Sequence, residues 1–265
     1  MNYADSIRKN GEYTEFNNNC IELLHNAPAR HSKFCFLSSL MHLEKAYKLE
    51  TIDKEMAIFR AITAEEEAAT GLMMCLKELN YKNAEKLRTR DHVCKNAISA
   101  FLVTIINDIN EVAHANFDSL LMRVDRSDKS PSLKLGIPLS RFGQSLIAWP
   151  VPPLNVHAKK NGLKFSYKNQ LRELINKKGK RDVISYIKEL ANERNKLLYA
   201  SPKGVAQATD NALNYINLKE QRVIFLLRAY LLIFPYKEKQ QMVQDSIDAF
   251  LAMLGTISYE GFSDT

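Results

Sequence analysis

The residues most suited to chemistry are acidic side chains placed where a helix should be apolar. From Met56 to Leu79, apolar residues recur at i, i+3 and i+4 spacing, which predicts one face of an amphipathic helix. Glu65 and Glu66 fall inside or beside this face, whereas Glu67 points away from it. An ionised carboxylate inside a core needs a partner of opposite charge. We therefore expect Glu65 and Glu66 to pair with a cation or to line a site.

A cation in a comparable position lies far downstream, at Arg194. Apolar residues from Val183 to Leu198 form a second helical stripe, and Arg194 lies near its centre. We expect the Arg194 guanidinium to face the middle of the fold and to meet Glu65 or Glu66. Such a pair either fixes the packing of the helices or belongs to a site, and the residue types leave both alternatives open.

The early Glu65-Glu66 pair and the late Arg194-Asn195 pair together resemble the HEPN-like superfamily of bacterial helical bundles. The ribonucleases of that superfamily carry Arg, often Arg-Asn, a short distance before a His on the same helix, and they act as dimers. Here Tyr199 stands in the place of the His, and no His follows later in the chain. A phenol, with a pKa of about 10, is a poor general base near neutral pH.

This resemblance implies a fold, an activity and a catalytic set. The fold it implies is a helical bundle over residues 33–115 and 167–254 with an insertion between them. In the implied site, Arg194 and Asn195 hold the scissile phosphate, Glu66 orients Arg194, and Tyr199 replaces the base. Whether the chain is an enzyme stays open. The implied enzyme is a metal-independent endoribonuclease without a cofactor, acting as a homodimer in a bacterial defence or toxin-type system.

A second group of residues suited to phosphate lies at the start of a predicted helix. Its basic members are Arg88, Arg90, His92 and Lys95. Free amide groups and the helix dipole at such a position favour an anion, so the group could hold a nucleotide or an RNA backbone. In the alternative, Asp91 caps the helix while the basic residues are solvated or pair with the acidic run 65–67. No second His or Cys stands at ligand spacing, so we expect no metal site.

The third candidate is a basic segment. The whole chain carries a formal charge of +7, and residues 159–196 hold nine Lys and three Arg against four acidic residues, a local excess of +8. An acidic partner is therefore most plausible here, and RNA is the leading one. The candidate contacts are Lys159, Lys160, Lys164, Lys178 and Arg181. Aromatic residues such as Phe165 and Tyr167 could stack on bases, although they suit a core equally well, and the charges could instead form a solvated face.

Other function classes lack their residues. The sequence contains no GxxxxGK[ST], GxGxxG, HExxH or GxSxG motif. Its four Cys are widely spaced, which is typical of reduced core thiols, and the first nineteen residues lack the apolar run of a secretory signal. We expect a cytoplasmic protein without a membrane span. The alternatives to an RNA-contacting protein are a non-catalytic interaction or regulatory subunit of a multi-protein defence assembly and a nucleotide sensor.

The pattern along the chain predicts a mainly α protein, a multi-helix bundle with a small insertion that contains a β-hairpin. We divide it into a lead-in (1–32), the first half of the bundle (33–115), a Pro-rich insertion (116–166), the second half (167–255) and a tail (256–265). The expected helices cover 33–49, 53–79, 91–115, 167–176, 180–199, 218–234 and 237–254, with a short one near 19–25. Asn161-Gly162 predicts a two-residue hairpin turn within 154–167, and strands are expected near 119–124 and 133–139.

Overall fold

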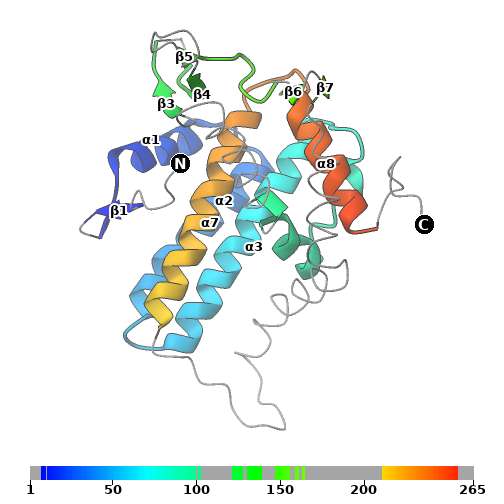
Figure 1. The fold of residues 1–265 in the computed structure, drawn as a ribbon. Coiled ribbons are helices and arrows are strands. Elements are labelled where there is room, and N and C mark those ends of the chain that lie inside the picture. Colours follow the sequence, from blue (N-terminus) through cyan, green and yellow to red (C-terminus); the bar gives the residue numbers. More distant parts are fainter. Residues whose placement is uncertain are drawn as a thin grey trace.

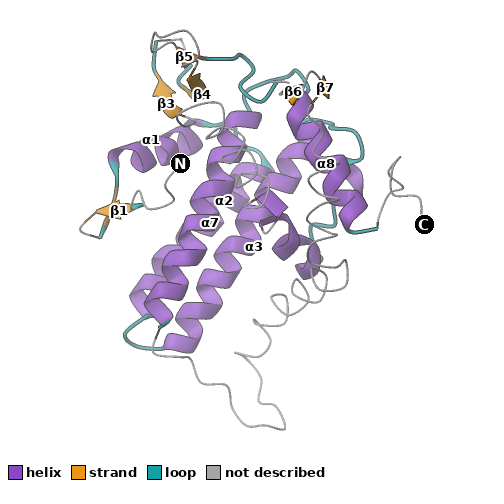
Figure 2. Ribbon diagram, viewed as in Figure 1, coloured by secondary structure: helices purple, strands orange, loops and turns teal. Residues whose placement is uncertain are grey.

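The protein is mainly helical, with small antiparallel β elements at its periphery (Figures 1 and 2). The computed structural model describes residues 7–9, 11–99, 101–102, 121–127, 130–138, 147–155, 159–160, 163–164 and 211–255. This confirms the predicted fold class, a helical bundle with a small β insertion. Among the described residues, no helix is both long enough and apolar enough to cross a bilayer.

Three long helices form the centre of the bundle: α2 (His31–Leu49), α3 (Lys54–Glu78) and α7 (Ala212–Ile233). The middle one, α3, packs against both α2 and α7, so segments far apart in sequence lie side by side (Figure 1). Its start is fixed as expected, because the Asp53 side chain accepts a hydrogen bond of 2.9 Å from the Met56 amide. Gly71 lets α2 approach closely, since a Cβ atom there would lie 2.8 Å from the Phe36 ring.

The main core lies between these helices and the shorter elements around them. Phe36 of α2 and Tyr230 of α7 are almost fully buried, and their ring centroids lie 4.8 Å apart. Each large side chain buried in this way stabilises the fold by roughly 1.5–3 kcal/mol. The last helix, α8 (Gln241–Met253), adds Phe250, whose ring centroid lies 5.3 Å from that of Phe101. The helices α7 and α8 thus share one core with α2.

The N-terminal region is more ordered than the expected lead-in. It forms a hairpin of β1 (Arg8–Lys9) and β2 (Glu12–Tyr13), followed by α1 (Glu15–Asn26), instead of only a short helix near 19–25. Cys20 and Leu24 of α1 are fully buried in the main core. The run of three Asn at 17–19 hides this helical face, which explains why the sequence pattern seemed weak.

A further helix begins at His92, and its described part covers residues 92–99 and 101–102. Its cap is the predicted one, because Asp91 accepts hydrogen bonds from the amides of Val93 (2.9 Å) and Cys94 (3.4 Å). The link from α3 contains a short 3-10 helix, η1 (Ala84–Lys86). Cys94 packs on Met73 of α3, with their sulfur atoms 3.8 Å apart, so this helix contributes to the main core.

The insertion packs on the bundle through a three-stranded antiparallel sheet. The strands are β3 (Leu121–Asp125), β4 (Ser132–Pro138) and β5 (Ile147–Ala148), in the order β3-β4-β5. Their register pairs Met122 with Leu135 and Val124 with Leu133, and these four residues belong to or pack against the main core. Gly136 is required at its position, because a Cβ atom would lie 2.8 Å from the Trp149 ring.

The two strands on either side of Asn161-Gly162 pair with the expected register. Strands β6 (Lys159–Lys160) and β7 (Leu163–Lys164) are antiparallel, and Lys160 pairs with Leu163 across the two intervening residues. The remainder of the predicted segment 154–167, apart from residues 154–155, lies outside the described residues. The expected helices 167–176 and 180–199 lie outside the described residues. The closing helix α7 begins at Ala212, six residues before the predicted start at Leu218.

Candidate functional site

Two consecutive buried carboxylates on α3 are the centre of the candidate site. Glu65 is 1% exposed and Glu66 is 3% exposed. Neighbouring residues on an α-helix point about 100° apart, because the helix has 3.6 residues per turn. Glu65 therefore faces α7, whereas Glu66 faces the helix that begins at His92. The prediction that Glu65 has a cationic partner is confirmed, and Glu66 contacts a histidine instead.

Glu65 is bound by two cations of α7. The Lys219 ammonium lies 2.7 Å from Oε2 of Glu65, and the Arg222 guanidinium lies 3.2 Å from its Oε1. Burial alone would raise the pKa of the Glu65 carboxyl, but these two cations outweigh it and hold that pKa below its usual value. Lys219 is itself only 2% exposed. The Glu65 carboxylate is therefore held ionised inside the bundle by its contacts with Lys219 and Arg222.

Glu66 makes a different contact, with a histidine at the surface. Nδ1 of His92 lies 2.8 Å from Oε1 of Glu66, and the side chains are 45% and 4% exposed, respectively. The carboxylate accepts the proton carried by Nδ1, which places the basic lone pair of a neutral imidazole on Nε2. This is the arrangement in which a buried acid orients a histidine for proton transfer. We call these two side chains the Glu66–His92 dyad.

The surface around the dyad is basic. Arg88 and Arg90 are exposed, and Lys95 is half-buried. Arg88 also lies 3.5 Å from the Asp91 carboxylate. The first amides of the helix are bound by Asp91, as in the structural alternative, so a phosphate at this surface would meet side chains rather than free backbone amides. That Arg88, Arg90, His92 and Lys95 bind phosphate stays a prediction.

The described partners of the two glutamates are Lys219 and Arg222 for Glu65 and His92 for Glu66. The His92 contact is the pairing with the acidic run 65–67 that the structural alternative predicted, whereas the expected pairing with Arg194 stays a prediction. Several of the predicted site residues lie outside the described residues: Arg194, Asn195, Tyr199, Lys178 and Arg181. Lys159, Lys160 and Lys164 are placed by backbone only, on strands β6 and β7, where Lys159 pairs with Lys164. Nothing in the described structure tests their binding role.

Sequence reasoning missed Lys219 and Arg222, although a signal for Lys219 was present. Lys219 stands three residues after Ile216 and four before Val223, and both are fully buried. It therefore occupies an apolar position of α7, just as Glu65 does on α3. The prediction began this helix at Leu218, which removed Ile216 from the pattern and hid the anomaly. Arg222 is part-exposed and carried no comparable signal.

No family model, curated protein or solved structure matches this chain. Within the part of the chain that the structure describes, no group of three or more His, Cys, Asp and Glu side chains could hold a metal ion. The four Cys are free and buried.

Proposed function

We propose that this protein contacts RNA through the basic surface around His92 and cleaves it without a metal ion. The observation that carries the proposal is the 2.8 Å contact between buried Glu66 and exposed His92. A buried carboxylate that fixes an accessible imidazole supplies a positioned base near neutral pH. The neighbouring Arg88, Arg90 and Lys95 supply cations for a phosphate backbone.

RNA suits such a base because each of its nucleotides carries a 2′-hydroxyl that becomes a nucleophile when its proton is removed. In the proposed step, Nε2 of His92 takes the proton of a ribose 2′-hydroxyl, and the 2′-oxygen attacks the adjacent phosphorus. The bond from phosphorus to the 5′-oxygen breaks, and that oxygen takes a proton from water. The hydroxide so formed takes the proton held on Nε2 of His92, which restores the neutral imidazole. The products are a 2′,3′-cyclic phosphate and a 5′-hydroxyl. DNA lacks the 2′-hydroxyl and cannot react in this way.

The Glu66–His92 dyad also supplies the general base that Tyr199 cannot provide. A tyrosine is a poor base near neutral pH, and His92 supplies the imidazole missing from the late helix. Arg194 and Asn195 remain the proposed phosphate ligands of the HEPN-like reading. The bacterial defence or toxin-type role, the homodimer and the cytoplasmic location belong to the same proposal. The buried free thiols fit a reducing compartment.

The decisive experiment is cleavage of single-stranded RNA by the purified protein in the presence of EDTA, with product ends identified. We expect cyclic-phosphate ends, no cleavage of the matching DNA, and loss of cleavage in His92→Asn. Asn keeps an N–H donor for Glu66 but lacks Nε2. The matched control is His25→Asn, since His25 is another exposed histidine. Absence of RNA cleavage, or full cleavage by His92→Asn, would contradict the proposed mechanism.

Binding can be tested separately from cleavage. Arg88→Gln combined with Arg90→Gln should weaken RNA binding and reduce its dependence on salt concentration, because two phosphate contacts are lost. Lys48→Gln is the matched control, since Lys48 is an exposed lysine on α2 that pairs with Glu44 one turn earlier. Equal binding by the double variant and the control would remove this surface from the proposal.

A second candidate is the non-catalytic interaction subunit, which one observation favours. Phe34 and Met41 of α2 are 55% and 46% exposed, and they stand seven residues apart on one face of the helix. If this face joins two copies of the chain, Phe34→Ser with Met41→Ser should lower the mass measured by sedimentation velocity. A lowered mass in this variant, together with no RNA cleavage by the wild type, would favour the interaction subunit, whereas RNA cleavage by the wild type would favour the enzyme.

A further inference from the structure

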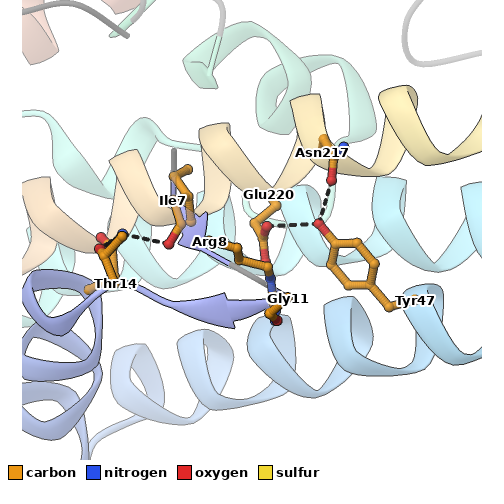
Figure 3. Close-up of polar contacts among 8 residues, drawn as sticks. Ile7, Arg8, Gly11, Thr14, Tyr47, Asn217 and Glu220 are labelled. Carbon is orange, nitrogen blue, oxygen red and sulfur yellow. Dashed lines mark hydrogen bonds and ion pairs between the residues drawn. The ribbon is translucent and has the colours of Figure 1, made fainter. Parts of the chain in front are cut away.

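A second charged cluster joins the N-terminal hairpin to the bundle. Nε of Arg8, on β1, donates to Oε1 of Glu220, on α7, at 2.9 Å. The guanidinium carbon lies 4.0 Å from the ring centroid of Tyr13 and 4.7 Å from that of Tyr47. Figure 3 shows Arg8 reaching α7 from the hairpin while Tyr47 approaches from α2. The planar cation thus lies over two aromatic rings and has a carboxylate within hydrogen-bond distance.

The bundle contributes most of this site. Oε2 of Glu220 accepts a hydrogen bond of 2.8 Å from the Tyr47 hydroxyl, which also lies 2.8 Å from the Asn217 side-chain oxygen (Figure 3). The Glu220 side chain is only 4% exposed. Burial and the Glu220 charge raise the pKa values of Tyr13 and Tyr47, so both phenols are neutral at physiological pH.

The hairpin that delivers Arg8 has little stability of its own. Each strand has two residues, and such a short isolated hairpin does not persist in water. Its turn is closed by a 2.8 Å hydrogen bond from Nη1 of Arg8 to the Gly11 carbonyl oxygen, where φ is +83°. Thr14 and Asn17 hold the Ile7 carbonyl oxygen. Arg8 therefore binds the hairpin to α7 through Glu220, while Ile7 and Tyr13 pack against the main core.

We propose that Tyr13, Tyr47 and Glu220 form a guanidinium-binding site, which the protein fills with its own Arg8 and which accepts another guanidinium when that side chain is absent. A guanidinium suits the site because it has two flat faces for the rings and N–H donors along its edge for the carboxylate. An ammonium lacks the faces. Without Arg8, Glu220 is a buried carboxylate without its cation, which favours binding of a replacement.

The test is chemical rescue in the full chain. Arg8→Ala removes the side chain beyond Cβ, and N-ethylguanidinium is the fragment removed. We expect it to raise the melting temperature of Arg8→Ala in a saturable manner and to leave that of the wild type unchanged. N-ethylurea, which has a similar shape without charge, and n-propylammonium, which is charged but not planar, should not do so. Lys9→Ala, at the exposed neighbour, is the matched control and should show no rescue.

Two further variants keep the proposal falsifiable if Arg8→Ala is too unstable to purify. Arg8→Lys keeps the charge, and we expect it to melt below the wild type and to gain less from N-ethylguanidinium than Arg8→Ala. Arg8→Ala combined with Glu220→Gln should lose the rescue, because the carboxylate is gone. Three results would each overturn the proposal. Arg8→Lys could melt at the wild-type temperature, n-propylammonium could rescue Arg8→Ala as well as N-ethylguanidinium does, or N-ethylguanidinium could fail to rescue Arg8→Ala.

Discussion

Glu65 and Glu66 are neighbours on one helix and are equally buried, yet their surroundings differ in kind. Glu65 is neutralised by Lys219, which is as buried as Glu65 itself, while Glu66 binds His92, whose side chain is 45% exposed. A buried carboxylate by itself shows only that a partner must exist. The exposure of the partner decides what the pair can do: a buried partner fixes packing, whereas an exposed one can exchange protons with a substrate.

The largest change in stability is expected when the buried charge of Glu65 is removed. Glu65→Gln should lower the free energy of unfolding by about 3–5 kcal/mol, because it leaves Lys219 with an uncompensated charge inside the bundle. Urea unfolding followed by circular dichroism measures this change. Glu67→Gln is the matched control, since Glu67 is half-buried on the same helix. A loss below about 1 kcal/mol would show that Glu65 does not fix the packing.

The Glu65 carboxylate should also make the unfolding free energy decrease as the pH falls. The pKa of Glu65 is lower in the folded protein than in an unfolded chain. Its contribution is therefore complete above the unfolded pKa of about 4.3 and is lost as pH falls through the lower, folded value. The difference in unfolding free energy between the wild type and Glu65→Gln should begin to shrink as pH falls below about 4.3, and it should be smallest below the folded pKa, where Glu65 is neutral in both states. A difference that grows on acidification would contradict this.

A smaller effect is expected from the second cation of the cluster. Arg222 lies 3.2 Å from Glu65 and is 20% exposed, whereas Lys219 lies 2.7 Å away and is buried. Arg222→Gln should therefore cost about 1 kcal/mol of unfolding free energy, within the range for part-exposed pairs. A double-mutant cycle of Arg222→Gln with Glu65→Gln measures the coupling. A coupling above about 3 kcal/mol would make Arg222 the main partner of Glu65.

Much of the fold followed from periodicity. The apolar stripes located α2 and α3 within two residues at each end, and Asp53 and Asp91 were identified as caps, because helix starts leave amides that a short acidic side chain can satisfy. The Asn161-Gly162 pair predicted the register of β6 and β7, because a hairpin loop of two residues allows only one pairing of the flanking strands. The weak point was α1, where polar residues interrupt a stripe that tertiary packing nevertheless buries.

The site was predictable only in part. A charge on an apolar stripe shows that a residue is buried, and this identified Glu65 and Glu66 correctly. Which cation meets which acid depends on how the helices are rotated and stacked, and sequence spacing within one helix does not contain that information. Arg194 and Lys219 each place a positive charge on an apolar stripe of their own segment, so spacing alone does not choose between them. The pairing of Glu66 with His92 required the short link after α3 to bring the next helix back against it.

The smallest expected change in stability is at His92, and it is the sharpest test of the comparison. His92→Asn keeps an N–H donor near the position of Nδ1, so Glu66 retains a hydrogen bond and the unfolding free energy should change by less than about 1 kcal/mol. RNA cleavage should nevertheless be lost, because Nε2 is gone. His92→Ala removes the donor as well and should cost more stability than His92→Asn. If His92→Asn and His92→Ala destabilise the fold equally while RNA cleavage is unchanged, then the dyad is a structural pair like the Glu65 cluster, and the difference between the two neighbours disappears.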